Sequence, residues 1–494
     1  MRRLCVAVVA YVAILSAIAI ARWHLWTYGA DTGTFAQVIA DAFGGFRDGP
    51  EQGSHFRFHW APILAVLEPL LLVTRSALSL QFAQIVLIAS TAFPLYAIAR
   101  RYASEARAAT YATLALLYPP LVAVAFAEFH EIAFYPVVAL GLMWAADASR
   151  WRVFALLVLA AVTIREEACL IFAIVGIALA GIGVVAARRS VTPQRRGLLR
   201  GAPAEPRALV LAGSGLALAS IAALLIYTRL VLPRVGAWQP MHFYAFSFAT
   251  GPQNVLLALL AHPAYVTTFL NRGRFTYVLE AFVPLALLPL RSRWSLLALP
   301  GLLVVLLSSE EIAWRMGSHY AAIFAPWLLL GAIAALVRFG DAKPSGDRTP
   351  LRFALGLCVV FLIFFNPTHV LHYLKPVYPN DDARLALASV PHGVTVATHD
   401  EWYTQIALRE PGATIFYCPY VRYAVYASDF PNAAFRNEIV PLLDADLASG
   451  RARVVARFGR VSVYRREPPP GARPIDCIRS GDLRYRSPTK SARR

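Results

Sequence analysis

The chain has 494 residues, of which 58% are hydrophobic and only 15% are charged, and its mean hydropathy is +0.54. Soluble domains carry about 25% charged residues, so this composition excludes an ordinary soluble protein, and the high hydrophobicity excludes intrinsic disorder. The formal net charge is +18, from 47 basic and 29 acidic residues. Basic residues collect in the cytoplasmic loops of membrane proteins, which explains this charge without a nucleic-acid partner. We therefore interpret the chain as a protein of the lipid bilayer that binds no nucleic acid.

About eleven apolar stretches can be interpreted as membrane spans, since roughly 20 residues cross about 30 Å of hydrocarbon. They lie near 4–21, 78–99, 108–127, 132–147, 153–165, 168–187, 208–230, 275–290, 295–308, 319–338 and 353–366. Arginines before the first span and in alternate loops place the N-terminus and those loops in the cytoplasm. An odd number of spans then puts the C-terminus outside. We expect an α-helical polytopic protein of the inner (plasma) membrane, in which the shorter spans could be re-entrant or broken.

The predicted topology divides the chain into three regions. Residues 1–370 form a transmembrane domain whose first outer loop is 22–77. Residues 371–470 form a small soluble α/β domain outside the membrane, with strands expected in VTVATH from 394, ATIFYC from 413 and RVSVYRR from 460. The tail 471–494, rich in Pro, Arg and Ser, is expected to be disordered.

Three smaller features belong to the outer side. The short apolar stretches 61–74 and 254–270 are expected to be helices at the outer membrane surface. Cys418 and Cys477 both fall in the outer domain, where a disulfide could form, although their spacing does not decide this.

The first outer loop contains the most distinctive candidate for catalysis, Asp31. Thr34 and Gln37 have the spacing of a capping box, and apolar residues then recur at helical spacing, which predicts an amphipathic helix over 34–46 that lies on the membrane. Asp31 precedes this helix, where the helix dipole favours an ionised carboxylate. Such a group can take a proton from an alcohol, or it can simply stabilise the start of the helix.

A second group of candidates is Arg165-Glu166-Glu167, which interrupts an apolar stretch from 153 to 187. The three residues could be a polar turn between two helices. Alternatively, a glutamate could orient a substrate or a metal while Arg165 binds an anion. His59 is expected on the same outer side.

Two further groups are also expected there. Glu128, His130 and Glu131 could bind a divalent cation, although their spacing matches no specific metal motif. Arg315 and His319 are one helical turn apart and would suit a phosphate, unless Arg315 pairs with the glutamate four residues before it. Together these groups predict a polar cleft that opens to the outer side.

Several segments resemble one family. They are ADTGTFAQ (30–37), FHWAPILAVLEPL (58–70), EFHE (128–131), REEACL (165–170), AFVPLALLPLRSRWSLLALPGLL (281–303), HYAAIFAPWLLLGA (319–332) and VTVATHDEWYTQIALRE (from 394). Over nearly the whole chain they resemble the bacterial DUF2079 membrane proteins, a family that itself resembles the GT-C superfamily of glycosyltransferases. The family usually has Lys or Arg with Glu-Asp where this chain has Arg165-Glu166-Glu167.

The resemblance implies a GT-C-like fold and transfer of a sugar from a polyprenyl-phosphate donor to a glycan, lipid or protein acceptor outside the membrane. Asp31 occupies the position of the acid that such enzymes carry in their first outer loop, and it would be the general base. Arg165, Arg315 or His319 would stabilise the departing phosphate, with a divalent metal ion at 128–131 as a possible cofactor. Two alternatives stay open: a transporter or lipid flippase that uses the outer carboxylates, and a non-catalytic membrane scaffold.

Overall fold

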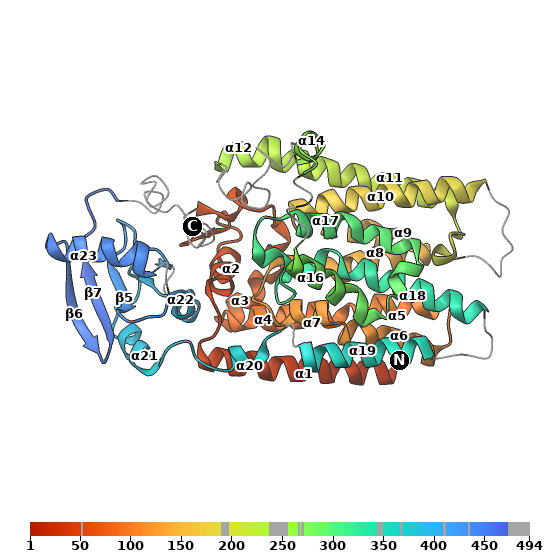
Figure 1. The fold of residues 1–494 in the computed structure, drawn as a ribbon. Coiled ribbons are helices and arrows are strands. Elements are labelled where there is room, and N and C mark those ends of the chain that lie inside the picture. Colours follow the sequence, from red (N-terminus) through yellow and green to blue (C-terminus); the bar gives the residue numbers. More distant parts are fainter. Residues whose placement is uncertain are drawn as a thin grey trace. The chain divides into compact units, whose positions relative to one another are not determined.

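The structure is a computed structural model that describes residues 1–472 apart from 51–52, 189–196, 237–254, 265–266, 268–270, 343–348, 366–367, 409–411 and 433–434. Packing divides the chain into two units (Figure 1). Unit 1 comprises Met1–Ala19, Phe56–Leu64 and Gln81–Val370. Unit 2 comprises Ile20–His55, Ala65–Leu80 and Leu371–Arg494. Most of the first outer loop therefore groups with the C-terminal residues and not with the helices of unit 1.

Unit 1 consists of helices, as its long apolar runs predict. Its helices are α1 (Arg2–Leu25) and α4 (Leu78–Ser90), both shared with unit 2, then α5 (Ala92–Arg100), α6 (Glu105–Leu117), α7 (Pro119–Phe126), α8 (Tyr135–Asp147), α9 (Trp151–Ala161), α10 (Glu166–Ala187), α11 (Pro206–Ile226), α12 (Leu232–Val235), α14 (Val255–Ala261), α16 (Arg272–Phe282), α17 (Leu299–Leu307), α18 (Ala325–Ala342) and α19 (Thr349–Val360). Large apolar side chains such as Leu211 and Leu218 of α11 are exposed. An exposed apolar surface of this kind suits a lipid environment.

Fewer helices than expected are long enough to span a membrane. Among the described residues, four qualify by length and apolarity: Arg2–Leu25, Leu78–Arg100, Glu166–Ala187 and Pro206–Val235. A fifth qualifies if Glu105–Leu117 and Pro119–Phe126, bent by 52°, form one span. Other apolar helices, such as Trp151–Ala161 and Ala325–Phe339, are shorter. The expected number of about eleven is therefore not matched by eleven long helices.

Proline explains the break in one predicted span, 275–290. The structure ends α16 at Phe282 and continues with two short 3-10 helices, Val283–Leu285 and Leu288–Arg291. Pro284 and Pro289 lie in these short helices, where each lacks the N–H that a continuous α-helix needs. Between them, Ala286 and Leu287 adopt left-handed φ values of 53° and 55°, which non-glycine residues rarely do. This segment is therefore an interrupted helix.

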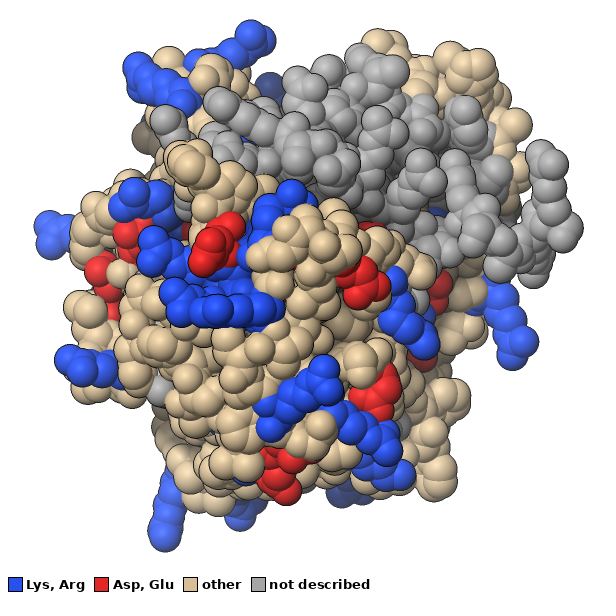
Figure 2. Space-filling view, turned by 90° about the vertical axis from the view of Figure 1, so that its left-hand side faces the viewer, with Lys and Arg blue, Asp and Glu red and all other residues tan. Residues whose placement is uncertain are grey.

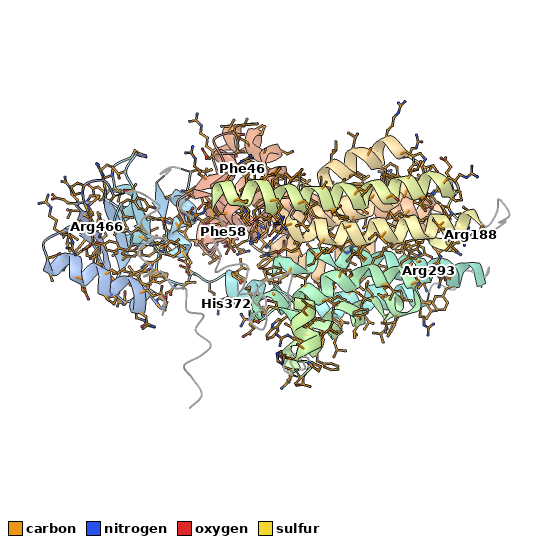
Figure 3. All side chains as sticks on the ribbon, turned by 90° about the horizontal axis from the view of Figure 1, so that it is seen from above. Phe46, Phe58, Arg188, Arg293, His372 and Arg466 are labelled. Carbon is orange, nitrogen blue, oxygen red and sulfur yellow. The ribbon has the colours of Figure 1, made fainter. Side chains whose placement is uncertain are left out.

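Loops that the sequence assigns to the cytoplasmic side contact one another. The buried Asp147 carboxylate, at the end of α8, accepts hydrogen bonds from Arg101 Nε (2.9 Å), Tyr102 Oη (2.7 Å) and the Leu198 N–H (2.7 Å). Trp294 Nε1 donates to the Leu199 carbonyl at 3.1 Å. In Figure 3, Arg188 and Arg293 lie toward one end of the helices of this unit and Phe58 toward the other. These contacts bring the loops together at one end of unit 1, and their cytoplasmic position stays a prediction.

Unit 2 contains a five-stranded mixed sheet with helices. The strands are β3 (Val396–Thr398), β4 (Ala413–Thr414), β5 (Tyr423–Ala427), β6 (Ala452–Phe458) and β7 (Val461–Arg466), and the C-terminal helices include α20 (Val370–Tyr373), α21 (Asp381–Ala388), α22 (Asp400–Ile406) and α23 (Val440–Ala448). The sheet order is β4-β3-β5-β7-β6; β3 is parallel to β4 and β5, whereas β7 is antiparallel to β5 and β6. This is the expected α/β domain.

The predicted strands correspond to β3, β4 and β7, whereas β5 and β6 were not expected. The strand β5 reads YAVYA and is almost entirely buried, so it has no alternation of polar and apolar residues to reveal it. In β6, by contrast, most side chains are at least partly exposed.

Figure 2 shows basic and acidic side chains interspersed on the face that lies on the left in Figure 1. Cys418 is buried and disulfide-bonded, while Cys477 and most of the predicted disordered tail lie outside the described residues.

The first outer loop differs from the prediction. Its helix α2 covers Ala30–Ala40 and not 34–46, and Gly29 is its N-cap. Thr34 and Gln37 form no capping box, because Thr34 Oγ1 donates to the Ala30 carbonyl and Gln37 Nε2 to the Ala407 carbonyl. Every residue from Thr32 to Ile39 is buried, so α2 has no apolar face left for a membrane surface. The rest of the loop forms β1 (Arg47–Asp48), β2 (Gly53–Ser54) and α3 (Glu68–Thr74).

Candidate functional site

The structure brings together five of the predicted residues in unit 1. We call them the charged cluster: His59, Glu131, Arg165, Glu166 and Glu167. They come from three loops, since His59 lies in the segment 56–64, Glu131 starts the 3-10 helix Glu131–Phe134, and the other three begin α10. The predicted groups at 59, 131 and 165–167 therefore belong to one site.

Local backbone contacts hold the His59 segment against the start of α10. The Ile63 N–H donates to the Thr163 carbonyl at 3.0 Å. Trp60 contributes twice, because its indole Nε1 donates to the Val162 carbonyl and its backbone N–H donates to Glu166 Oε2, both at 2.8 Å. Glu166 and Glu167 occupy the first turn of α10, where the helix dipole stabilises negative charge.

Arg165 is the centre of the charged cluster. Its Nη1 lies 3.0 Å from Glu131 Oε1, and its Nε lies 2.8 Å from Glu167 Oε2. The Arg165 side chain is 5% exposed and that of Glu131 is fully buried. Burying such a pair is costly, and each charge depends on the other for compensation.

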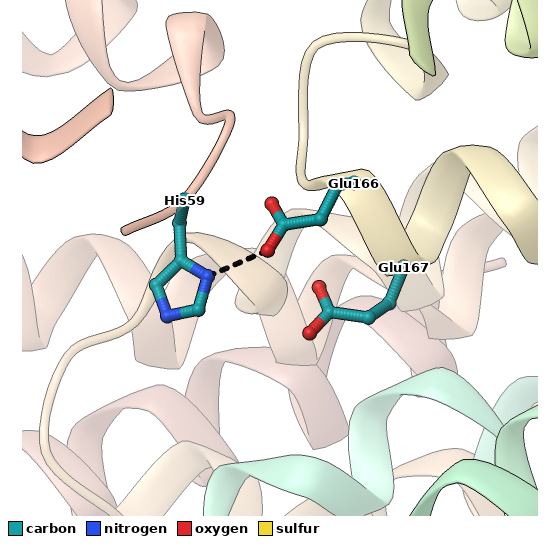
Figure 4. Close-up of side chains that lie close together, drawn as sticks. All are labelled: His59, Glu166 and Glu167. Atoms are coloured by element: carbon teal, nitrogen blue, oxygen red, sulfur yellow. Dashed lines mark hydrogen bonds and ion pairs between the residues drawn. The ribbon is translucent and has the colours of Figure 1, made fainter. Parts of the chain in front are cut away.

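The partners of His59 define its tautomer. Its Nε2 lies 3.0 Å from Arg165 Nη2, and since a guanidinium can only donate, Nε2 is the acceptor. Its Nδ1 then carries the proton and donates to Glu166 Oε1 at 2.8 Å (Figure 4). The ring is thus neutral, and the charged cluster has three carboxylates but only one guanidinium.

The residues whose ligand atoms lie close enough to hold a metal ion are not the ones predicted. Among the described residues, the side chains with metal-ligand atoms within 4.8 Å of one another are His59, Glu166 and Glu167. Glu131, which was expected to bind metal with Glu128 and His130, instead pairs with Arg165. His130 Nδ1 lies 3.0 Å from the backbone carbonyl of Glu128. The structure thus gives the Glu131 carboxylate a guanidinium partner, and metal binding at 128–131 stays a prediction.

Two histidines from distant segments stack beside the charged cluster. The rings of His130 and His319 have centroids 3.4 Å apart and are nearly parallel, at 21°. Burial lowers the pKa of His130, although the nearby Glu131 carboxylate acts in the opposite direction. Among the described residues, Nε2 of the buried His319 has no hydrogen-bond partner. His319 is thus close to the candidate site, as predicted, but through His130 and not through Arg165.

Arg315 does not take part in the site. The expected helical turn from Arg315 to His319 is absent, because Glu311–Trp314 is one 3-10 helix, Arg315 is extended and a second 3-10 helix starts at His319. Arg315 Nη2 pairs with Glu311 Oε1 at 2.7 Å, and both side chains are more than half exposed. The plain ion pair was therefore the correct alternative.

Asp31 lies in unit 2, in the first turn of α2, and its side chain is exposed. Thr404 of α22 fixes this turn: its Oγ1 accepts from the Gly33 N–H at 3.1 Å and donates to the Gly29 carbonyl. A Cβ on Gly33 would come within 2.7 Å of the Tyr403 ring and 2.9 Å of the Thr404 Cα, so glycine is needed for this approach. Whether Asp31 faces the charged cluster stays a prediction.

The contacts of three residues were not predicted from the sequence. Trp60 contacts the charged cluster, and Gln37 and Thr404 fix α2 to the C-terminal part of unit 2. Besides its bond to Ala407, Gln37 Nε2 donates to the Ala413 carbonyl at 3.3 Å, and its Oε1 accepts from the Gly49 N–H at 2.8 Å. The bonds to Ala407 and Ala413 join the first outer loop to residues 370 and 376 positions later. No pattern in the sequence indicates such long-range hydrogen bonds.

Apolar helices with charged side chains gathered at their ends define an α-helical membrane protein. The chain belongs to the family described as "Predicted membrane protein (DUF2079)", which matches residues 21–422. A comparison with curated proteins gives no match.

Among solved structures, ArnT from Cupriavidus metallidurans bound to undecaprenyl phosphate is 14% identical, with a TM-score of 0.48, and the match covers 92% of this chain and 98% of that one. The archaeal oligosaccharyltransferase AglB from Archaeoglobus fulgidus, in complex with an inhibitory peptide and a dolichol-phosphate, is 12% identical, with a TM-score of 0.43 and coverage of 87% and 70%. These similarities are too remote to assign an activity to this chain.

Proposed function

We propose that this protein is a membrane glycosyltransferase that moves a sugar from a polyprenyl-phosphate donor to an acceptor hydroxyl on the extracytoplasmic side of the inner membrane. The motifs described above resemble those of DUF2079 proteins, and the resemblance of that family to the GT-C superfamily supports the proposal. The observation that carries it is the buried Arg165, enclosed by Glu131, Glu167 and His59 in loops between apolar helices. Charged groups at such positions are costly and usually serve a function.

In this proposal Asp31 is the general base. Its carboxylate removes the proton from the acceptor hydroxyl as the oxygen attacks the anomeric carbon of the sugar. The bond from that carbon to the phosphate oxygen breaks, and its electron pair leaves with the lipid phosphate. Inversion at the anomeric carbon follows from this single displacement. The exposed position of Asp31 at the N-terminus of α2 supports the role, because the helix dipole keeps the carboxylate ionised.

We assign the phosphate end of the donor to the charged cluster. Arg165 cannot hold a phosphate by itself, because its guanidinium already contacts Glu131, Glu167 and His59. With three carboxylates against one guanidinium, the charged cluster repels an anion unless a further cation is present. The soluble domain of unit 2 is the candidate surface for the acceptor.

The proposal is tested by replacing Asp31 with Asn in the producing organism and profiling its envelope glycans and lipid-linked sugars by mass spectrometry. The expected result is the loss of one glycan and accumulation of its lipid-linked donor, as in a deletion strain. Asp41→Asn is the matched control, because Asp41 lies at the C-terminal end of the same helix and pairs with Arg47. A glycan profile that is unchanged in the Asp31→Asn strain and in the deletion strain contradicts the proposal and favours a scaffold or a transporter.

One observation favours a transporter as the second candidate. The bent pair α6 and α7 and the interrupted segment 283–291 are the kind of discontinuous helices that line transport sites. In that case the charged cluster would bind a polar headgroup during transport. Vesicles that contain only this protein would then accumulate a substrate or exchange lipid between leaflets, with no sugar transferred.

A further inference from the structure

We propose that His59, Glu166 and Glu167 bind one divalent cation that accepts both nitrogen and oxygen ligands, such as Mn²⁺ or Zn²⁺. An imidazole with two carboxylates is a common ligand set for these ions. The cation site rests on the charges and geometry of the charged cluster. Only its role toward a phosphate rests on the proposed function.

The proposed ligand atoms are already close together, although binding requires a change of the His59 tautomer. The three ligand atoms lie within 4.8 Å of one another, and Figure 4 shows both carboxylates pointing toward the His59 ring. Around a cation with bonds of about 2.1 Å, neighbouring ligand atoms are about 3 to 3.4 Å apart. Rotation of a glutamate side chain can close this difference. Glu166 is already fixed toward the site, because its Oε2 accepts from the Trp60 N–H at 2.8 Å.

The charge balance favours a cation. Within the charged cluster, the carboxylates of Glu131, Glu166 and Glu167 accompany one guanidinium, that of Arg165, and the contacts of the His59 ring with Glu166 and Arg165 make it neutral. When all three carboxylates are ionised, the net charge is −2, from three negative charges and one positive. One divalent cation neutralises this charge, whereas a bound phosphate without a cation would make the net charge more negative.

Exposure divides the charged cluster into a structural part and an open part. Arg165 and Glu131 are 5% and 0% exposed, so they form the closed back of the site. The side chains of His59, Glu166 and Glu167 are more exposed, at 19%, 13% and 31%, so they form the open part of the charged cluster. A metal with three protein ligands and open positions is the pattern of catalytic sites, whereas structural sites are closed.

A buried imidazole without a partner is a second, independent observation. His319 is 9% exposed, and its Nε2 has no hydrogen-bond partner among the described residues. Its ring stacks on that of His130, and the next residue along the chain, Glu131, pairs with Arg165 of the charged cluster. A buried polar atom without a partner costs free energy, and a water or phosphate oxygen on the cation would supply the partner.

Binding of the ion replaces one hydrogen bond. The Nδ1 of His59 now donates to Glu166, so the ring must move its proton to Nε2 before Nδ1 can bind a metal. Nε2 then becomes a donor and can no longer accept from Arg165 Nη2. The cation and the His59–Arg165 hydrogen bond therefore exclude each other. A cation with open positions would then contact the phosphate of the donor and stabilise it as it leaves.

The test uses the full-length protein in lipid nanodiscs, stripped of metal with a chelator and titrated with Mn²⁺ alone. Electron paramagnetic resonance measures the free ion. We expect one saturable equivalent per chain in the wild type, displaced by Zn²⁺. The affinity should fall at least tenfold in Glu167→Gln and in His59→Gln, because each loses a direct ligand and even indirect partners of a metal contribute about 10- to 100-fold.

Glu311→Gln is the matched control, because this exposed carboxylate pairs with Arg315 outside the charged cluster and its loss should leave Mn²⁺ binding unchanged. Glu166→Gln keeps an oxygen for the Trp60 N–H, so it is the variant to use if Glu167→Gln fails to fold. The inference is overturned if the wild type binds no Mn²⁺, or if folded Glu167→Gln and His59→Gln bind it as the wild type does. Mn²⁺ binding without any effect of the Asp31 variant on glycans would leave the cation site standing and remove the transferase proposal.

Discussion

Replacing Arg165 with Gln should destabilise unit 1 strongly, because it leaves a buried charge without compensation. The Glu131 carboxylate is fully buried and lies 3.0 Å from Arg165 Nη1. Removing one partner of such a buried pair costs about 3 to 5 kcal/mol, since the remaining carboxylate loses its guanidinium and is shielded from water. The matched control is Arg315→Gln. Arg315 and Glu311 are 63% and 52% exposed, so this change should cost at most about 1 kcal/mol.

Both variants can be compared by equilibrium unfolding in mixed micelles, with a thiol-reactive dye that reports exposure of the buried Cys169 and Cys358. The double variant Glu131→Gln with Arg165→Gln should recover a large part of the lost stability, because no buried charge then lacks a partner. The reasoning is refuted if Arg165→Gln unfolds like Arg315→Gln, or if the double variant is no more stable than Arg165→Gln.

Three further predictions concern packing, the outer loop and pH. Gly176→Val and Gly213→Val should prevent stable folding of unit 1, because a Cβ on either glycine would lie 2.5 Å from the backbone of the neighbouring helix; Gly181→Ala and Gly215→Ala, on the same helices but in open space, should be neutral or stabilising by up to about 1 kcal/mol in the same unfolding assay. Thr404→Val should weaken protection of α2 in hydrogen exchange by about 1 to 3 kcal/mol, whereas Thr404→Ser keeps the hydroxyl and should not. Burial lowers the pKa of His399 to about 3. Because the unfolded state, with a pKa near 6.5, takes up the proton first, unit 2 should lose roughly 1.4 kcal/mol per pH unit as the pH falls from about 6 toward 3; above pH 6.5 this contribution is fully present. Comparison with His399→Gln isolates the contribution of His399 to this pH dependence. An equal pH dependence of stability in the two proteins would contradict the prediction.

The sequence predicted the helical membrane class because apolar runs and the positions of arginines are local signals. It also predicted three of the five strands, those with recognisable alternation or flanking turns. It allowed for broken short spans but did not place the break at 283–291, because prolines such as Pro284 and Pro289 can also kink a helix that continues. The strand β5 was missed because a fully apolar pentapeptide has no alternation of polar and apolar residues to indicate a strand.

The proximity of five candidate residues was predicted, but their pairings were not. Outer-side position alone brought His59, Glu131 and Arg165-Glu166-Glu167 together, because loops on the same side of a bundle meet at the same end. Which carboxylate pairs with which cation depends on distances between loops, and the spacing of residues in the sequence does not determine these distances. Glu131 was therefore assigned to a metal when it pairs with Arg165. Arg315 was included because a continuous helix was assumed where the backbone is extended.

The most direct test of the central claim, that the charged cluster receives the phosphate of a lipid carrier, is native mass spectrometry of the purified protein with polyprenyl phosphate. This lipid needs no knowledge of the sugar. The account predicts that the wild type binds one lipid when Mn²⁺ is present, that Glu167→Gln loses it, and that Glu311→Gln keeps it. Binding that is absent in the wild type, or equal in Glu167→Gln, would contradict the account.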